Sequence, residues 1–133
     1  MAARRLVLTY GTFDLLHYGH IRLLARARAL GNELAVGLST DAFNAIKGKE
    51  AHMTYDARRS FLLELRSVGE VFPEETWEQK ADDIKRLGAA ILVMGDDWAG
   101  KFDQFKTLCE VVYLERTPDI SSTLLRQALS AAP

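Results

Sequence analysis

The residues best suited to chemistry are two histidines three positions apart, His17 and His20, with Gly19 between them. They follow an apolar run, 6–10, typical of a buried strand, and they precede a segment, 21–30, whose leucines recur at helical spacing. Both imidazoles would therefore lie where a helix begins, and the unpaired backbone N–H groups there favour phosphate. Residues three apart share one face of a helical turn, and a glycine lets an anion approach the backbone. The pattern predicts a phosphate site with titratable donors.

The chemistry that suits such a site is nucleotidyl transfer, in which a phosphate monoester attacks the α-phosphate of a nucleoside triphosphate and expels pyrophosphate. Fixed donors aimed at the α-phosphoryl oxygens would supply most of the acceleration, because negative charge accumulates there in the transition state. The attacking phosphate is already an anion, so the histidines would act as donors and not as nucleophiles. Two alternatives are a histidine pair that only caps a helix or packs in the core, and a zinc site. Zinc needs three or four ligands at suitable spacing, and His52 and Cys109 provide no such cluster.

The composition is that of an ordinary globular domain, because 48% of the 133 residues are hydrophobic and 26% are charged. We expect one domain over residues 1–133. The 17 lysines and arginines against 18 aspartates and glutamates argue against a non-specific nucleic-acid binder. A single cysteine excludes an internal disulfide framework, and no apolar run approaches the roughly 20 residues of a membrane span. These features predict a cytoplasmic protein without nucleic-acid or membrane partners.

Strand-like and helix-like segments alternate along the chain, which predicts an α/β fold with right-handed crossovers and a mostly parallel sheet covered on both faces. We expect a Rossmann-like three-layer α/β/α sandwich with five strands. Ligands bind beyond the carboxyl ends of the strands in such sheets, so the segments that carry the candidate residues should meet at one edge. The predicted strands are 6–10, 33–39, 71–72, 90–94 and 110–114, and the predicted helices are 21–30, 55–68, 76–87 and 122–129.

Two motifs give the chain a family resemblance. The segment 11–20, Gly-Thr-Phe-Asp-Leu-Leu-His-Tyr-Gly-His, and the segment 116–123, Arg-Thr-Pro-Asp-Ile-Ser-Ser-Thr, resemble the two signatures of the cytidylyltransferase-like nucleotidyltransferases. The likeness runs from about Leu6 to Leu129. It includes Trp-Glu-Gln-Lys at 77–80 and Met-Gly-Asp-Asp-Trp at 94–98. The chain departs from the pattern at Gly69, Pro118-Asp119 and Ser122.

The resemblance implies a role for each matching residue. Asp14 keeps several alternatives: it could be a turn residue that binds local backbone amides, it could orient a histidine, or it could contact the Mg²⁺ that accompanies CTP. Arg58 and Arg66, eight positions apart, would lie on one helix face beside the acceptor. The implied catalytic residues are His17, His20, Lys47 and Arg116; the implied nucleotide-binding residues are Thr12, Phe13, Asp14, Gly19, Lys49, Asp97, Thr117, Ile120, Ser121 and Ser122; the implied acceptor-binding residues are Arg58, Arg66, Trp77 and Lys80.

The likeness is greatest to bacterial family members that use glycerol 3-phosphate. It implies transfer of CMP from CTP to sn-glycerol 3-phosphate by direct in-line displacement, giving CDP-glycerol and pyrophosphate. It also implies a homodimer and a role in supplying precursor for wall teichoic acid or a similar polymer. The alternatives are the same chemistry on ethanolamine phosphate, choline phosphate, a polyol phosphate or FMN, and a catalytically silent nucleotide-binding protein. A fragment of a class I aminoacyl-tRNA synthetase is disfavoured by size and charge.

Overall fold

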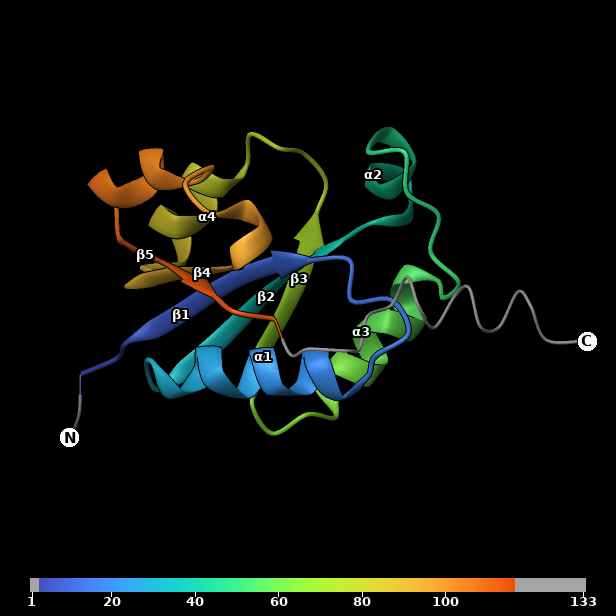
Figure 1. The fold of residues 1–133 in the computed structure, drawn as a ribbon, viewed down its shortest axis with the longest axis horizontal. Coiled ribbons are helices and arrows are strands. Elements are labelled where there is room, and N and C mark those ends of the chain that lie inside the picture. The colour runs from blue at the N-terminus through green and yellow to red at the C-terminus, as the bar shows by residue number, and fades with distance from the viewer. Residues whose placement is uncertain (1–2, 117–133) are drawn as a thin grey trace, which may run out of the picture.

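A computed structural model describes residues 3–116 and arranges them around one five-stranded sheet with the strand order β3-β2-β1-β4-β5 (Figure 1). Every pairing between neighbouring strands is parallel, so the carboxyl ends of all five strands lie at the same edge. The predicted five-stranded sheet is confirmed. The strands are β1 (Leu6–Gly11), β2 (Glu33–Ser39), β3 (Glu70–Glu74), β4 (Ile91–Gly95) and β5 (Glu110–Leu114).

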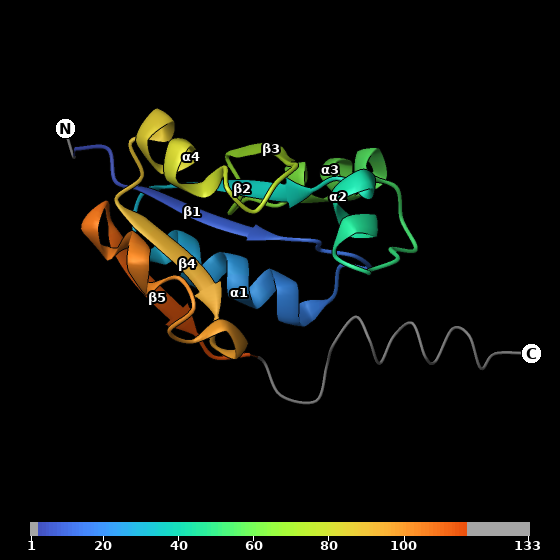
Figure 2. The ribbon, with the colours of Figure 1, turned by 90° about the horizontal axis from the view of Figure 1, so that it is seen from above.

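Helices cover both faces of the sheet, as Figures 1 and 2 show. Successive residues of a strand point to opposite faces, and β1 feeds both layers in this way. Val7 packs in one cluster with Leu24 and Leu62, whereas Leu8 packs in the other with Ile84. The predicted three-layer α/β/α sandwich is therefore confirmed. The helices are α1 (Tyr18–Ala29) and α3 (Tyr55–Leu63) on one face, α4 (Lys80–Leu87) on the other, and α2 (Asp41–Ile46) after β2.

The helix boundaries differ from the predicted ones in two places, one at the carboxyl edge of the sheet and one at the opposite edge. The segment after β2, for which no helix was predicted, begins as the short helix α2, whose first turn is capped by the Thr40 hydroxyl accepting the N–H of Phe43 at 3.1 Å. Helix α3 ends at Leu63 and not at residue 68. The chain must turn there, because Val68 is buried and the Gly69 N–H bonds the carbonyl of Leu34 at 2.9 Å to start β3.

The segment before α4 also differs from the prediction. The Gln79 side chain accepts the N–H groups of Glu75 and Thr76, which stabilises a turn, and the helix itself begins only at Lys80. Strand β3 is longer than predicted and contains Pro73. Proline is tolerated there because β3 is the outer strand of the sheet.

Some predicted features lie outside the described residues: the helix 122–129, the Pro118-Asp119 departure, and the candidate site residues Thr117, Ile120, Ser121 and Ser122. Within residues 3–116, no helix has the length and apolar character that a bilayer crossing requires.

Candidate active site

The predicted site residues follow the carboxyl ends of the strands. Because the sheet is parallel, the loops after β1, β2, β3, β4 and β5 all begin at one edge (Figure 1). The five loops begin after Gly11, Ser39, Glu74, Gly95 and Leu114. This arrangement agrees with the expectation that ligands bind at that edge.

The two histidines cap the start of α1, because each imidazole accepts a backbone N–H group in the first turn. The Nδ1 atom of His17 accepts the N–H of Gly19 at 3.0 Å, and the Nδ1 atom of His20 accepts the N–H of His17 at 3.3 Å. The two rings stack with their centroids 4.0 Å apart. Because Nδ1 accepts in both rings, the proton of each neutral imidazole is on Nε2. The Nε2 atom of His17 is buried without a hydrogen-bond partner in the described part of the chain, so it is available to a ligand.

Both histidines are neutral at neutral pH. Burial lowers the pKa of His20 to about 4, and the charges of His17 and Arg116 act in the same direction, while Asp14 opposes them. Burial and the charge of Arg116 also lower the pKa of His17. The charge of Arg116 thus acts on both histidines. The rings are suited to donate hydrogen bonds and not to deliver protons.

The loop between β1 and α1 has an unusual backbone. Phe13 and Leu15 have φ angles of 49° and 48°, in the left-handed region that side chains other than glycine rarely adopt. The Phe13 ring is buried and packs edge-on against the His20 ring, with centroids 5.6 Å apart. A Cβ at Gly11 would lie 2.8 Å from that ring. The Phe13 side chain therefore packs against His20, and its contact with a nucleotide stays a prediction.

Asp14 anchors a loop that is distant in sequence. Its carboxylate is buried and accepts the N–H groups of His52 at 2.9 Å and Met53 at 3.1 Å. The carboxylate binds backbone amides, as one of the predicted alternatives had it, but these amides belong to a distant loop and not to the local turn. The contacts of Asp14 with a histidine and with Mg²⁺ stay predictions.

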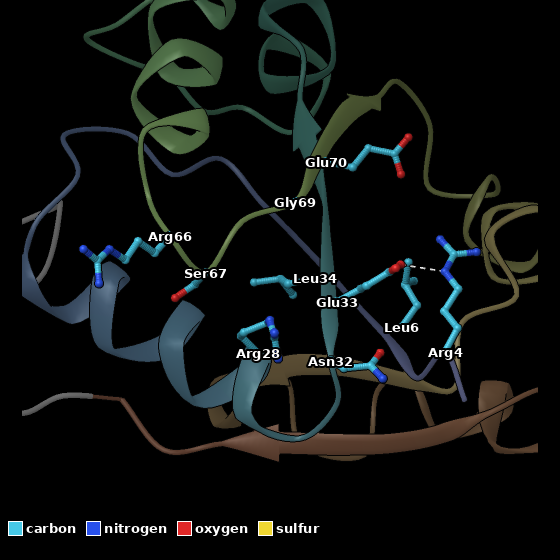
Figure 3. Close-up of a pocket in the computed structure, with 10 residues that line it drawn as sticks. All are labelled: Arg4, Leu6, Arg28, Asn32, Glu33, Leu34, Arg66, Ser67, Gly69 and Glu70. Carbon is cyan, nitrogen blue, oxygen red and sulfur yellow. Dashed lines mark hydrogen bonds and ion pairs between the residues drawn. The ribbon is translucent and has the colours of Figure 1, made fainter. Parts of the chain in front are cut away.

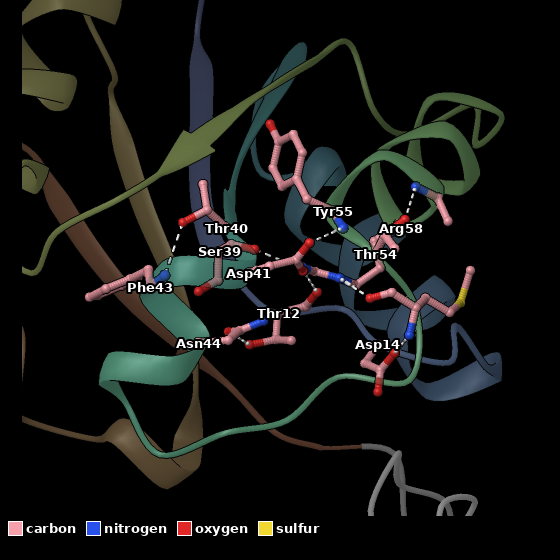
Figure 4. Close-up of polar contacts among 12 residues, drawn as sticks. Thr12, Asp14, Ser39, Thr40, Asp41, Phe43, Asn44, Thr54, Tyr55 and Arg58 are labelled. Carbon is pink, nitrogen blue, oxygen red and sulfur yellow. Dashed lines mark hydrogen bonds and ion pairs between the residues drawn. The ribbon is translucent and has the colours of Figure 1, made fainter.

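Arg58 is fully buried and binds the protein itself. Its Nη1 donates to the carbonyls of Thr12 and Ser39, both at 2.8 Å, and its Nη2 donates to the Asp41 carboxylate at 2.7 Å (Figure 4). Its Nε donates to the Met53 carbonyl at 3.1 Å. Four of the five N–H donors of a guanidinium are thereby used. The predicted acceptor contact is corrected: Arg58 positions the loops after β1 and β2.

Asn44 is a candidate that the sequence did not reveal. Its Oδ1 accepts the Thr12 hydroxyl at 3.1 Å, which joins the loop after β1 to helix α2. The side chain is buried, and its Nδ2 has no hydrogen-bond partner within residues 3–116. A buried amide without a partner is a donor available to a ligand. The Thr40 cap, four residues earlier, was a sequence signal for α2, but nothing in the spacing pointed to Asn44.

Lys47 ends helix α2 and lies against two aromatic rings. Its Nζ is 4.8 Å from the centroid of the Phe43 ring and 5.8 Å from that of Trp77. Burial lowers the pKa of Lys47 to about 8, with the Glu74 charge opposing the shift. Gly48 follows with a φ of 73°, and it turns the chain toward the exposed Lys49.

Lys80 is buried among charged and aromatic groups. Its Nζ pairs with the Glu74 carboxylate at 2.7 Å, and both side chains are nearly inaccessible. The same Nζ lies 4.6 Å from the centroid of Tyr10, 5.5 Å from that of Trp77 and 5.6 Å from that of Phe102. The predicted neighbours Trp77 and Lys80 are therefore brought together. Sequence reasoning missed Tyr10 and Phe102, which come from distant segments, and also Glu74, which lies six positions before Lys80.

Arg66 does not belong to this edge. Because α3 ends at Leu63, Arg66 does not share a helix face with Arg58, and that prediction is wrong. Arg66 instead lines a pocket where strands β1, β2 and β3 begin, at the opposite edge of the sheet (Figure 3). Its neighbours there include Arg4, Arg28, Asn32, Glu33, Gly69 and Glu70.

Asp97 lies in a 3₁₀ turn, 96–98, directly after β4. A Cβ at Gly95 would lie 2.7 Å from its Oδ1, so the carboxylate folds back over the strand end. Its contact with a nucleotide stays a prediction. The part of the chain that the structure describes holds no group of three or more His, Cys, Asp or Glu side chains that could bind a metal.

Curated relatives and solved structures resemble the chain over most of its length. It is 52% identical to the glycerol-3-phosphate cytidylyltransferase of Staphylococcus aureus over 123 residues, which cover 92% of this chain and 93% of that protein. It is 53% identical to the Bacillus subtilis protein of the same name over 124 residues, with 93% and 96% covered.

The solved structures share the fold. The lipopolysaccharide core biosynthesis protein of Thermoplasma volcanium superposes with a TM-score of 0.73 at 21% identity, covering 86% of this chain and 99% of the other. A bifunctional NMN adenylyltransferase/ADP ribose pyrophosphatase of Francisella tularensis gives 0.69 at 14% identity, covering 98% of this chain and 43% of the other. At these identities the likeness concerns the fold alone. The Cytidylyltransferase-like family model matches residues 8–128, more than half of the chain, and the chain belongs to that family.

Proposed function

We propose that this protein transfers CMP from CTP to sn-glycerol 3-phosphate and releases CDP-glycerol and pyrophosphate. The observation that carries the proposal is the histidine pair at the start of α1, which presents neutral rings protonated on Nε2. The choice of substrates is supported by relatives named glycerol-3-phosphate cytidylyltransferase that are 52% and 53% identical over nearly the whole chain.

The reaction is a direct in-line displacement at the α-phosphorus. An oxygen of the glycerol phosphate forms a bond to that phosphorus, the bond to the β-phosphate oxygen breaks, and pyrophosphate leaves with the electron pair. His17 and His20 donate through Nε2 to the α-phosphoryl oxygens, where charge develops. Arg116 and Lys47 add positive charge. No base is needed, which suits histidines whose pKa values are lowered.

The nucleotide is held by groups around the histidine pair. Thr12, Gly19 and Lys49 contact the phosphates, and Asp97 accepts the cytosine amino group. The support for these assignments is their position after β1, β2 and β4 together with the family motifs. The family motif assigns the remaining phosphate contacts to Thr117, Ile120, Ser121 and Ser122.

The acceptor binds near Lys47 and Trp77. The half-exposed indole and the lysine beside it offer a surface for a short polyol and its phosphate. Mg²⁺ accompanies CTP in this proposal. The described residues provide no ligand set of their own for it, so triphosphate oxygens and water would hold it, and no step here depends on it.

We further propose that the protein acts in the cytoplasm as a homodimer and supplies an activated polyol phosphate for a polymer such as wall teichoic acid. The free Cys109 is compatible with a reducing compartment.

The test is pyrophosphate release with CTP and Mg²⁺ across a panel of phosphorylated alcohols: glycerol 3-phosphate, ethanolamine phosphate, choline phosphate, a longer polyol phosphate and FMN. We expect turnover with glycerol 3-phosphate well above that with the others. Preference for another acceptor would contradict the proposal that glycerol 3-phosphate is the substrate. CTP binding without turnover on any acceptor would identify a silent binder.

A further inference from the structure

Helix α1 is tied to the chain that follows β5 by the side chain of Arg26. The ladder between β4 and β5 ends at Leu114, so the chain leaves the sheet at Glu115. The Nη1 atom of Arg26 donates to the Glu115 carbonyl at 2.9 Å. In the described part of the chain, no other side-chain hydrogen bond reaches Glu115 or Arg116. This bond therefore fixes the backbone directly before Arg116, which belongs to the proposed mechanism.

Arg26 lies on a helix that packs firmly against the sheet. Its neighbours Leu24 and Ala27 are fully buried in the core. The first turn of the same helix carries His17 and His20, and Arg26 follows His20 by about 9 Å along the helix axis. Helix α1 is therefore one rigid element that holds both the histidines and, through Arg26, the chain after β5.

The charges that act on the histidines indicate that Arg26 serves the site indirectly. Arg116 contributes to lowering the pKa of both His17 and His20, whereas Arg26 is not among the groups that shift either pKa. The two rings are held by their own contacts with backbone N–H groups. Loss of the Arg26 side chain would leave these contacts in place and would free only the segment that carries Arg116.

We propose that Arg26 is a positioning residue, which holds the Glu115 carbonyl so that the charge of Arg116 stays beside the phosphates of CTP. The stabilisation of transition-state charge by a fixed group depends on its exact position, so a small displacement of that group is costly in rate. This inference rests on the proposed function and adds to it the contact that keeps its arginine in place.

The first test measures backbone order by NMR relaxation and needs no turnover. Methionine is long and unbranched but has no donor, so Arg26→Met removes the hydrogen bond. We expect the order parameters of the Glu115 and Arg116 amides to fall from about 0.85 to about 0.6 or below. The matched control is Arg28→Met. Arg28 lies on the same helix and donates to the Gly31 carbonyl, also at 2.9 Å, but at the opposite edge of the sheet. Its loss should leave both order parameters unchanged.

The second test is a double-mutant cycle on pyrophosphate release with CTP and glycerol 3-phosphate. Arg26→Met should lower kcat about tenfold and keep KM for glycerol 3-phosphate within about twofold of the wild-type value. In an Arg116→Met background, the same substitution should lower kcat by less than about twofold, because the group through which Arg26 acts is gone. Arg26→Lys, which keeps a donor near the carbonyl, should recover part of the rate. Arg28→Met should keep the wild-type kcat.

The outcomes separate the two proposals. Unchanged order parameters in a folded Arg26→Met would overturn the inference, whatever its activity. Losses of kcat that multiply in Arg26→Met/Arg116→Met would also overturn it, since the two residues would then act independently. No turnover of glycerol 3-phosphate by the wild type would remove the proposed function, while a loss of order in Arg26→Met would still establish that Arg26 holds the chain after β5.

Discussion

The two sides of the site treat their polar groups in opposite ways. On the histidine side, the Nε2 atom of His17 is buried and has no partner among residues 3–116. On the lysine side, Lys80 pairs with Glu74, and Arg58 donates four hydrogen bonds to oxygens of the protein. Donors without a partner are available to stabilise charge that develops during a reaction, whereas charged groups that are already paired within the protein stabilise its fold. The first side should therefore determine the rate of the reaction, and the second should determine the stability of the fold.

The largest effect is expected when the Nε2 donor of His17 is removed while the acceptor at its Nδ1 position is kept. His17→Asn retains an oxygen that can accept the Gly19 N–H, but it removes the Nε2 donor. We expect kcat to fall by roughly 10²–10⁴-fold with little change in Tm. Pyrophosphate release and thermal unfolding give the two readings. Near-normal turnover would end the donor mechanism, and His17→Gln, which places an amide donor near Nε2, should recover part of the rate.

On the lysine side, the expected loss is in stability. Arg58→Met leaves the carbonyls of Thr12, Ser39 and Met53 without their donor, and we expect the free energy of unfolding to fall by about 3 kcal/mol. Urea unfolding measures the change. Arg59→Met, an exposed neighbour on the same helix, is the control and should stay within about 0.5 kcal/mol of wild type. Equal stability of the two variants would contradict the positioning role.

The free energy of unfolding at acid pH tests whether His20 is buried as a neutral ring. The folded protein holds the pKa of His20 near 4, mainly by burial, against 6.5 for an unperturbed histidine. The unfolded chain therefore binds more protons between these values, so the contribution of His20 is present above pH 6.5 and is lost as pH falls toward 4.

We expect this contribution to be on the order of 1–2 kcal/mol. Urea unfolding at several pH values, with His20→Asn as the reference, isolates it from the carboxylates. Parallel pH profiles for the two proteins would show that His20 is not buried as a neutral ring.

The smallest expected effect concerns Lys47 at alkaline pH. Burial lowers its pKa from 10.5 to about 8, so the free protein loses this charge as pH rises above 8. We expect KM for the anionic acceptor to increase by up to about tenfold between pH 7 and pH 9. Lys47→Arg, which stays charged, should flatten that increase. A wild-type KM that is constant to pH 9 would contradict a phosphate contact by Lys47.

The sequence predicted the sheet and the histidine pair because both depend on local patterns. Apolar runs alternate with helical spacing, and the two rings are three positions apart. It failed where an outcome depends on distant groups. Arg58 looked like a ligand contact, yet the carbonyls that bury it come from residues 46 and 19 positions away. Arg66 was misplaced because α3 stops early to start β3. The cluster around Lys80 includes Tyr10 and Phe102, which no spacing rule connects to 74–80.

The four hydrogen bonds of Arg58 also bear on how the chain acquires its site. They join segments that follow β1, β2 and the loop before α3, across up to 46 positions of sequence. Contacts of such long range close large loops and are slow to form. The ends of β1 and β2 already pair with each other in the sheet, and the hydrogen bond from Thr12 to Asn44 joins the loop after β1 to α2. Docking of α3 adds Arg58, which fixes both of these loops to the loop before α3. We therefore expect a growing chain to acquire the full rigidity of its site only after this helix has been made and has docked.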